Sequence, residues 1–360
     1  MGVFYFCTML DFIIVGSGLA GLSFAEIALQ NNCSICVVDN NAQNASYVAG
    51  GLYNPIILKR FTKAWQADIQ LKLAPIFYRQ LELKLNASFY FDLPVLRRFY
   101  SIEEQNNWFV SADKPELSKY LSGKLLGDVF KGIQAPFGYG QVNATGFVDV
   151  AVLIDSYRAY LNDLKSFLNE TFMHHELQIN ADCVVYKNIK AKHIVFAEGF
   201  GMLQNPYFSD LPLVSSKGEL LLIHAPELHV DCIVNAGIFI LPVGNGYFKI
   251  GATYNWEDQT SMPTEDARKE LSSQLDTIID CDYTVVEQYA GIRPTVKDRR
   301  PLVGTHHTYK QLHLLNGLGT RGVLVGPAMA QALFNHLMNN EPLPDEINIH
   351  RFYKKQGIKI

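Results

Sequence analysis

The hydrophobic and polar positions at the start of the chain predict a buried strand, a helix and a second strand. Residues 12–15 are all apolar and mostly β-branched, as is typical of a strand buried in a parallel sheet. Over residues 19–30 the apolar side chains recur at roughly helical spacing. Val37 and Val38 form a second apolar run, which ends at Asp39. The pattern therefore indicates a β–α–β unit.

The rest of the chain alternates between two kinds of segment. One kind has the buried strands and helices of the first unit, and the other is typical of antiparallel sheets. Helical patterns cover 63–85 and 149–168, strand-like runs lie at 89–100, 108–111 and 194–197, and a turn-rich stretch lies at 137–140. A strand-rich block covers 212–289 and includes runs at 219–223, 238–241 and 247–251. From residue 312 the chain predicts a strand, a glycine-rich turn, and a helix that begins at Pro327 and ends near Met338.

This alternation predicts an α/β fold with two interleaved domains. We expect a Rossmann-like domain made of residues 9–85, 145–212 and 290–360. We expect a second, α+β domain, built on a mostly antiparallel sheet, from residues 86–144 and 213–289. A length of 360 residues agrees with about two domains.

The composition is that of a globular protein with no general attraction for nucleic acid. Hydrophobic residues make up 48% and charged residues 18% of the chain, and the formal net charge is −4. Only a local basic patch could therefore attract RNA or an anionic membrane. Residues 1–15 lack a basic leader and contain Asp11, so they predict neither a signal peptide nor a spanning helix. Because Met9 lies just before the first strand, residues 1–8 are interpreted as an upstream extension.

The six cysteines are scattered, and we interpret them as reduced thiols of a cytoplasmic protein. Cys33 and Cys36 have the spacing of a redox motif. They lead directly into the second strand rather than opening a helix, so a pair of buried thiols is the preferred interpretation.

Gly16, Gly18 and Gly21 join the first predicted strand to its helix. In this spacing the first glycine permits a tight turn, the second lets a pyrophosphate approach the helix N-terminus, and the third lets helix and strand pack closely. Asp39 lies 23 residues after Gly16, where a carboxylate can accept hydrogen bonds from an adenosine ribose. Strand, turn, helix and acid together predict a bound dinucleotide.

The glycine-rich segment 316–322 near the C-terminus predicts where a ring system would lie. Three glycines in seven residues allow a flat ring to approach the backbone, and the N-terminus of the following helix carries a partial positive charge. That charge would stabilise the negative charge of a reduced flavin, which a nicotinamide would not need. An ordinary strand–helix turn is the simpler explanation of this segment taken alone.

Four motifs together resemble the D-amino-acid oxidase/glycine oxidase/sarcosine oxidase superfamily of FAD-dependent amine oxidoreductases. The matching segments are 16–21, 49–55, Gly291-Ile292-Arg293-Pro294 with Asp298, Pro301 and Gly304, and 317–322. The resemblance runs from residue 9 to about residue 340. It implies an FAD cofactor, and because no cysteine lies in the loop where sarcosine oxidases tether their flavin, it implies noncovalent FAD.

The resemblance also implies which residues contact the cofactor. Leu177 would make a backbone contact with adenine, because His174-His175-Glu176-Leu177 precedes Gly199 by the family's distance, and the two histidines are not expected to bind a metal. Asp39 stands where the family more often has Glu. The full set is Gly16, Gly18, Leu19, Ala20, Gly21, Asp39, Asn40, Ser46, Ala49, Gly50, Gly51, Leu52, Leu177, Ala197, Gly199, Arg293, Gly317, Leu318, Gly319, Thr320, Arg321, Gly322 and Val323.

Arg293 is the main candidate for substrate recognition. The matching arginine of the family binds the substrate carboxylate. A planar, permanently charged guanidinium group suits that role because it can donate two parallel hydrogen bonds. Lys249 resembles the lysine that sarcosine oxidases place near the flavin, although an exposed lysine on a sheet is nearly as good an interpretation. Thr253 stands where the family has a histidine, and Phe239 stands where D-amino-acid oxidases have a carboxylate-binding tyrosine. Tyr254 completes the candidate catalytic residues.

The expected activity is oxidation of the C–N bond of an amino acid or N-substituted glycine by hydride transfer to flavin N5, followed by hydrolysis of the imine. This chemistry depends more on the orientation of the substrate than on a general base. An NAD(P)H-dependent reductase is a remote alternative, since only one Gly-x-Gly-x-x-Gly unit is present. A non-catalytic FAD-binding protein would be expected to lose Arg293.

A second resemblance suggests a different substrate. Residues 251–254 with Glu257 and Asp258, and residues 318–322, are similar to the FAD domain of the bifunctional bacterial enzyme that trims carboxymethylaminomethyl groups on tRNA wobble uridine. The basic, aromatic stretch 59–65 could contact RNA, although a helix start is the simpler explanation. A small-molecule amine is thus the expected partner, with tRNA as the alternative. No membrane insertion is expected, and the oligomeric state, the electron acceptor and the orientation of Lys249 are left open.

Overall fold

The computed structural model describes residues 9–42 and 45–354, and the predicted upstream extension, residues 1–8, lies outside them. The first of two large sheets is built around parallel strands in the order β11, β2, β1, β14, β21. These strands span Phe167–Leu168, Ile35–Val38, Leu10–Val15, Ile189–Phe196 and Leu312–Asn316. Strands β12 (Leu177–Ile179), β13 (Val184–Tyr186) and β20 (Leu302–Thr305) add antiparallel pairs. The strand–helix–strand prediction at the start of the chain is therefore confirmed.

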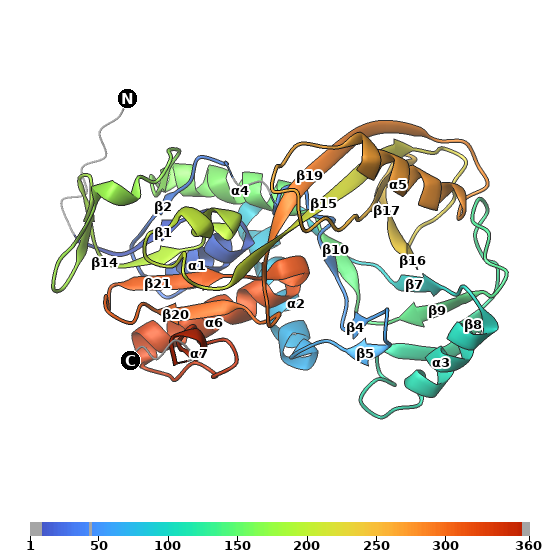
Figure 1. The fold of residues 1–360 in the computed structure, drawn as a ribbon, viewed down its shortest axis with the longest axis horizontal. Coiled ribbons are helices and arrows are strands. Elements are labelled where there is room, and N and C mark those ends of the chain that lie inside the picture. Colours follow the sequence, from blue (N-terminus) through green and yellow to red (C-terminus); the bar gives the residue numbers. More distant parts are fainter. Residues whose placement is uncertain (1–8, 43–44, 355–360) are drawn as a thin grey trace.

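Four helices pack over one face of this sheet (Figure 1). They are α1 (Leu19–Gln30), α2 (Ala67–Leu85), α4 (Val150–Asp163) and α6 (Gly322–Asn339). Their apolar sides form one core with the inward side chains of β1 and β2. The opposite face forms a second core with residues 172–213 and with the short helix α7 (His350–Tyr353). Because both faces are covered, the parallel strands are apolar on both sides.

The second large sheet is almost wholly antiparallel. Its order is β19, β15, β18, β17, β16, β7, β9, β8, and only the β16–β7 pair is parallel. The bounds are Thr284–Val296, Leu213–His224, Tyr247–Gly251, Ile238–Gly244, Ile233–Ala236, Val95–Arg98, Tyr139–Val142 and Leu121–Leu126. Helices α5 (Glu265–Asp276) and α3 (Ile102–Ala112) flank it (Figure 1).

Short elements complete the fold. Strands β3 (Leu52–Tyr53), β10 (Gly146–Val148) and β6 (Tyr90–Asp92) form a small sheet, and β4 (Ile56–Ile57) pairs with β5 (Thr62–Lys63). Single turns of 3₁₀ helix occur at His174–Glu176 and Gly319–Arg321, and a longer one at Gly199–Gln204.

The mixed α/β fold class is confirmed, and the strands of the two large sheets alternate along the chain. The boundary expected at residue 290 falls inside β19, which runs without a break from Thr284 to Val296. The strand expected at 108–111 is wrong, because these residues lie in α3. The signal for that helix is its N-cap, where the Ser101 side chain accepts a hydrogen bond from the Glu104 N–H at 3.2 Å.

The predicted start of the last helix is also wrong. Helix α6 begins at Gly322, so Pro327 lies inside its second turn instead of opening it. A proline there cannot donate a hydrogen bond to the carbonyl of Val323, four residues earlier. The hydroxyl of Tyr78 in α2 donates to that carbonyl instead, at 2.7 Å. The contact between the two helices makes the internal proline tolerable.

Within the described residues, no helix combines the length and apolar character that crossing a membrane requires.

Candidate functional site

A cavity of about 480 Å³ lies between the two large sheets and is lined by residues of both. The first sheet and its helices contribute the glycine turn after β1, the end of β2 and the start of α6. The second sheet contributes Gly218, Leu220, Phe239 and Arg293. The cavity therefore brings the predicted dinucleotide-binding elements together with the predicted substrate arginine.

Three glycines shape the nucleotide end of the site by close packing of backbone. A Cβ atom on Gly16, whose φ is +100°, would lie 2.5 Å from the carbonyl oxygen of Ala197. A Cβ atom on Gly21 would lie 1.9 Å from the carbonyl oxygen of Gly16, so Gly21 lets α1 pack against the turn. Gly18 lines the cavity, and a Cβ there would be 3.0 Å from Ser46 Oγ. The roles predicted for Gly16 and Gly21 agree with this geometry.

The N-termini of α1 and α6 both face the cavity, with Gly18, Leu19, Gly322 and Val323 among its lining residues. Neither helix has a side-chain cap or an acidic residue in its first turn. Leu19 N–H of α1 donates to Ser46 Oγ at 3.3 Å, and the helix dipole makes both ends favourable for negative charge. This arrangement fits FAD, whose pyrophosphate suits the first helix and whose flavin pyrimidine edge suits the second.

Asp39 lines the cavity at the end of β2, as predicted, but its carboxylate is already engaged. Its Oδ2 accepts hydrogen bonds from Ser17 N–H at 2.7 Å and Ser17 Oγ at 2.6 Å. Arg158 of α4 also donates to it at 3.0 Å. Sequence reasoning missed Arg158, which is 119 residues away and reaches Asp39 only through the packing of α4. The pairing fixes the Asp39 carboxylate at the position where the sequence predicts a contact with ribose.

Leu177 is not among the cavity-lining residues, and its expected contact with adenine stays a prediction. It begins β12 and is buried in the core on the outer face of the first sheet. The 3₁₀ turn at His174–Glu176 places Thr171, Phe172 and His174 at the cavity instead. There His174 Nε2 is 2.8 Å from the carboxylate of Glu198, which also lines the cavity.

Arg293 projects from β19 into the cavity, as predicted. Its Nη1 donates to the carbonyl oxygens of Lys217 at 3.3 Å and Thr253 at 3.2 Å. It forms no salt bridge with a carboxylate of the described residues. Burial lowers the pKa of the guanidinium, and the ring of Tyr254, 4.5 Å away, opposes that shift. The site therefore holds a cation that lacks an anionic partner.

Gly218 makes room for this guanidinium. A Cβ atom on Gly218 would lie 1.8 Å from Arg293 Nη2. Gly218 itself lines the cavity, so the arginine lies flat against the backbone of β15. The requirement for glycine was not evident from the sequence, because β15 and β19 pair across 75 residues.

The other three candidate catalytic residues differ in their position relative to the cavity. Tyr254 lines the cavity and is 59% exposed. Thr253 is buried and contributes its carbonyl to Arg293, but its side chain accepts a hydrogen bond from Glu219 N–H. Lys249 is half-buried on β18 between Leu222 and Leu241 and does not line the cavity. The structure thus places Lys249, whose orientation the sequence left open, outside the cavity lining.

Arg321 is a second arginine at the cavity without a carboxylate partner in the described part of the chain. Its guanidinium donates to the carbonyl oxygen of Asn54, and burial lowers its pKa to about 10. Phe239 also lines the cavity, with its ring close to Gly50.

Most of the predicted cofactor-binding residues meet at this cavity. Gly21 and Gly317, like Leu177, Lys249 and Thr253, do not line it. The predicted residues that line it are Gly16, Gly18, Leu19, Ala20, Asp39, Asn40, Ser46, Ala49, Gly50, Gly51, Leu52, Ala197, Gly199, Tyr254, Arg293, Leu318, Gly319, Thr320, Arg321, Gly322 and Val323. No cysteine in residues 9–42 and 45–354 lines the cavity, and no group of three or more metal-binding side chains occurs in those residues.

Comparisons with known proteins agree with this site. The family of FAD dependent oxidoreductases matches residues 11–335. The chain therefore belongs to that family and uses FAD.

The chain is similar to individual proteins that are named glycine oxidase or MnmC. The glycine oxidase of Pseudomonas putida is 25% identical over 92% of this chain and 96% of its own length. The alignment with the glycine oxidase of Bacillus subtilis, 23% identical, spans 62% of this chain and 65% of the relative. The tRNA 5-methylaminomethyl-2-thiouridine biosynthesis bifunctional protein MnmC of Haemophilus ducreyi is 22% identical over 93% of this chain, which spans 57% of that protein.

Solved structures share the fold. The glycine oxidase of Geobacillus kaustophilus superposes with a TM-score of 0.75 at 16% identity and covers 93% of this chain and 95% of its own. The iminodiacetate oxidase of Chelativorans gives a TM-score of 0.73 at 18% identity, with 93% and 98% covered.

Proposed function

We propose that this protein oxidises the C–N bond of a small amine that carries a carboxylate next to the reacting carbon, such as glycine or an N-substituted glycine. The observation that carries this proposal is the guanidinium of Arg293, which lines the cavity and has only neutral partners in the described chain. A buried cation without a counter-ion favours an anionic ligand. Relatives named glycine oxidase and iminodiacetate oxidase support this substrate class.

The residues of the chain would act mainly by orienting the substrate. Arg293 would bind the substrate carboxylate through two parallel hydrogen bonds, which fixes the orientation of the neighbouring carbon. Bound FAD supplies the two-electron acceptor, and we propose that it is held without a covalent bond. A hydride would leave the amine carbon for that acceptor, a proton would leave the nitrogen for solvent, and water would then hydrolyse the imine. Apolar side chains such as Phe239 and Leu220 would keep bulk water away from the reacting carbon.

Anaerobic titration of the purified, FAD-loaded protein tests this proposal. Glycine, sarcosine and other N-alkylglycines are added in turn while the flavin absorption band is followed, and air is then admitted. We expect one of these compounds to bleach the band. In Arg293→Met the half-saturating concentration should rise at least about a hundredfold, because a charge-assisted bidentate contact contributes about 3 kcal/mol. A wild-type protein that none of them reduces would contradict the free-amine proposal.

A second candidate substrate is a carboxymethylaminomethyl group on tRNA. It is favoured by the similarity to MnmC and by two aromatic side chains of the segment after β18, Tyr254, which lines the cavity, and Trp256, which are 59% and 54% exposed. Exposed aromatic rings can stack on unpaired bases. Titration with tRNA that carries this modification, against unmodified tRNA, separates the two candidates, since only the modified form should bleach the flavin.

We also propose a cytoplasmic location. Among the described residues the cysteines are free thiols, four of the five are buried, and this agrees with a reducing compartment.

A further inference from the structure

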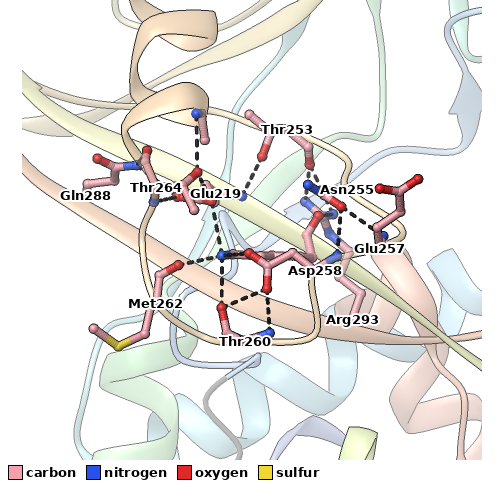
Figure 2. A network of polar contacts seen from close by, with 12 residues as sticks. Glu219, Thr253, Asn255, Glu257, Asp258, Thr260, Met262, Thr264, Gln288 and Arg293 are labelled. Carbon is pink, nitrogen blue, oxygen red and sulfur yellow. Dashed lines mark hydrogen bonds and ion pairs between the residues drawn. The ribbon is translucent and has the colours of Figure 1, made fainter.

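The irregular segment 252–264, between β18 and α5, is held against β15 by a network of polar contacts (Figure 2). Its first part continues the pairing of β18, because Lys217 and Asn255 exchange two backbone hydrogen bonds of 2.7 and 2.9 Å. Its last residue, Thr264, donates two hydrogen bonds to the carboxylate of Glu219, at 2.9 Å from N–H and 2.8 Å from Oγ1. Both parts of the segment are therefore anchored at the same short stretch of β15, Lys217–Glu219.

Lys217 is the ionic centre of this network. Its side chain is 1% exposed, and its ammonium group contacts Asp258 at 2.6 Å and Glu219 at 3.4 Å. It also donates to Thr260 Oγ1 at 3.4 Å and to the carbonyl oxygen of Met262. Three of these four partners belong to the segment 252–264. The hydrogen bond from Lys217 is the main reason that the pKa of Asp258 is lowered to about 2, so the Asp258 carboxylate stays ionised at any ordinary pH.

The same short stretch of β15 also supports Arg293. Side chains alternate along a strand, so Gly218 and Leu220 face the cavity while Lys217 and Glu219 face the segment. The carbonyl of Lys217 accepts a hydrogen bond from Arg293, and so does the carbonyl of Thr253. Next to Thr253, the ring of Tyr254 lies 4.5 Å from the guanidinium. Two of the contacts that orient Arg293 thus come from the segment that Lys217 holds.

We propose that Lys217 is a positioning residue for the carboxylate site: its buried ammonium group, bound to Asp258, holds the segment 252–264 so that the Thr253 carbonyl and the Tyr254 ring fix the guanidinium of Arg293. The inference rests on the proposed function, because it assigns Lys217 a role through Arg293. A misplacement of about 1 Å in a positioning contact can cost on the order of a hundredfold in rate. Neither Lys217 nor Asp258 touches the cavity.

The test compares three single variants of the FAD-loaded protein by the binding of acetate, a carboxylate probe followed by its effect on the flavin spectrum. Asp258→Asn keeps the shape of the side chain but removes its charge, and Lys217→Met removes the ammonium group. Glu257→Gln is the matched control, because that neighbouring side chain is exposed and has no ion pair in the described chain. The affinity for FAD and the melting temperature are measured for each variant.

We expect Asp258→Asn to weaken acetate binding about tenfold or more while the FAD affinity stays within about twofold of wild type. Lys217→Met should weaken acetate binding further. A variant that combines Asp258→Asn with Lys217→Met should bind acetate as weakly as Lys217→Met alone, because both changes release the same segment. Unchanged acetate binding in Asp258→Asn, with Arg293→Met still defective, would overturn the inference and leave the proposed function standing. Equal losses of acetate and FAD binding would also overturn it, since they would show a general structural role. If wild type itself binds no acetate and is reduced by no carboxylate amine, the proposed function fails instead.

Discussion

Arg293 occupies its place in the cavity because Gly218, on the neighbouring strand β15, has no side chain. Gly218 and Arg293 lie on neighbouring strands, and a Cβ on Gly218 would come within 2.3 Å of three guanidinium atoms. The guanidinium cannot keep its hydrogen bonds to Lys217 and Thr253 if it must move away from such an atom. The identity of residue 218 therefore controls the direction in which the arginine points.

We predict that Gly218→Ala weakens acetate binding by about tenfold to a hundredfold while FAD remains bound. The displaced guanidinium loses its geometry, but the nucleotide end of the cavity is untouched. Spectral titration of the FAD-loaded variant gives the measurement. Gly123→Ala is the control, because a Cβ there meets no atom within 4 Å. Wild-type acetate affinity in Gly218→Ala would contradict the prediction.

At the residue scale the sequence was most informative where chemistry depends on one residue in a local motif. Gly16 and Gly21 were predicted because their spacing alone demands glycine, and Arg293 because it follows Gly291 in a motif. Arg158, Gly218 and Lys217 could not be predicted, since each acts on a partner that tertiary packing brings from 41 to 119 residues away.

At the scale of elements, the contact between α2 and α6 explains how a proline fits inside a helix that begins at the cavity. The carbonyl of Val323 would be buried without a donor if Tyr78 did not supply its hydroxyl. An unsatisfied buried carbonyl costs roughly 1 to 3 kcal/mol. Helix α6 begins at the cavity, so this contact also helps to hold the helix N-terminus in place.

We predict that Tyr78→Phe lowers the free energy of unfolding by about 1 to 3 kcal/mol, because the Val323 carbonyl loses its donor. Adding Pro327→Ala should restore part of that loss, since residue 327 then has an N–H that can donate to Val323. Urea denaturation of the single and double variants measures both effects. Tyr78→Phe with wild-type stability, or a double variant that is less stable than Tyr78→Phe, would contradict the explanation.

The elements themselves were largely predictable where their pattern is long and regular. Strand β18 was predicted with its observed bounds, and the helices near 63–85 and 149–168 were found with late starts or early ends. The run at 108–111 was mistaken for a strand because Trp108 and its neighbours are apolar over too few residues to show a helical repeat. The order of strands in the sheets was not predictable, because it depends on pairing between distant segments.

For the whole molecule, four histidines make stability depend on pH. Burial lowers the pKa of His193, His306, His313 and His350 below the ordinary value, and for His306 to about 4. His313 is 1% exposed, and the nearby His193 and His336 lower its pKa further. These groups are neutral when folded, so the unfolded chain binds more protons than the native state below about pH 6.5. Their contribution is complete above that pH and is lost as the pH falls.

We therefore predict that the melting temperature falls as the pH is lowered from 7.5 to 5, because the free energy of unfolding decreases by up to roughly 1.4 kcal/mol per pH unit for each fully neutral histidine. His313→Gln should make this fall shallower, even though the variant loses the hydrogen bonds to Thr305 and His193. His175→Gln is the control, because that side chain is exposed. Parallel curves for wild type and His313→Gln would contradict the assignment.

Strand β1 cannot complete its pairing until the ribosome has synthesised its parallel neighbour β14. Leu10 pairs with Ala191, so the strand that begins the first sheet waits for 181 residues before its inner neighbour exists. At translation rates of about 5 to 20 residues per second, that interval is roughly 10 to 40 seconds. During it, β1 can pair only with β2, and one edge of an apolar strand stays open. The nascent chain is thus exposed to aggregation well before its cofactor cavity can form, and chaperones that shield the first 190 residues would have the largest effect on its yield.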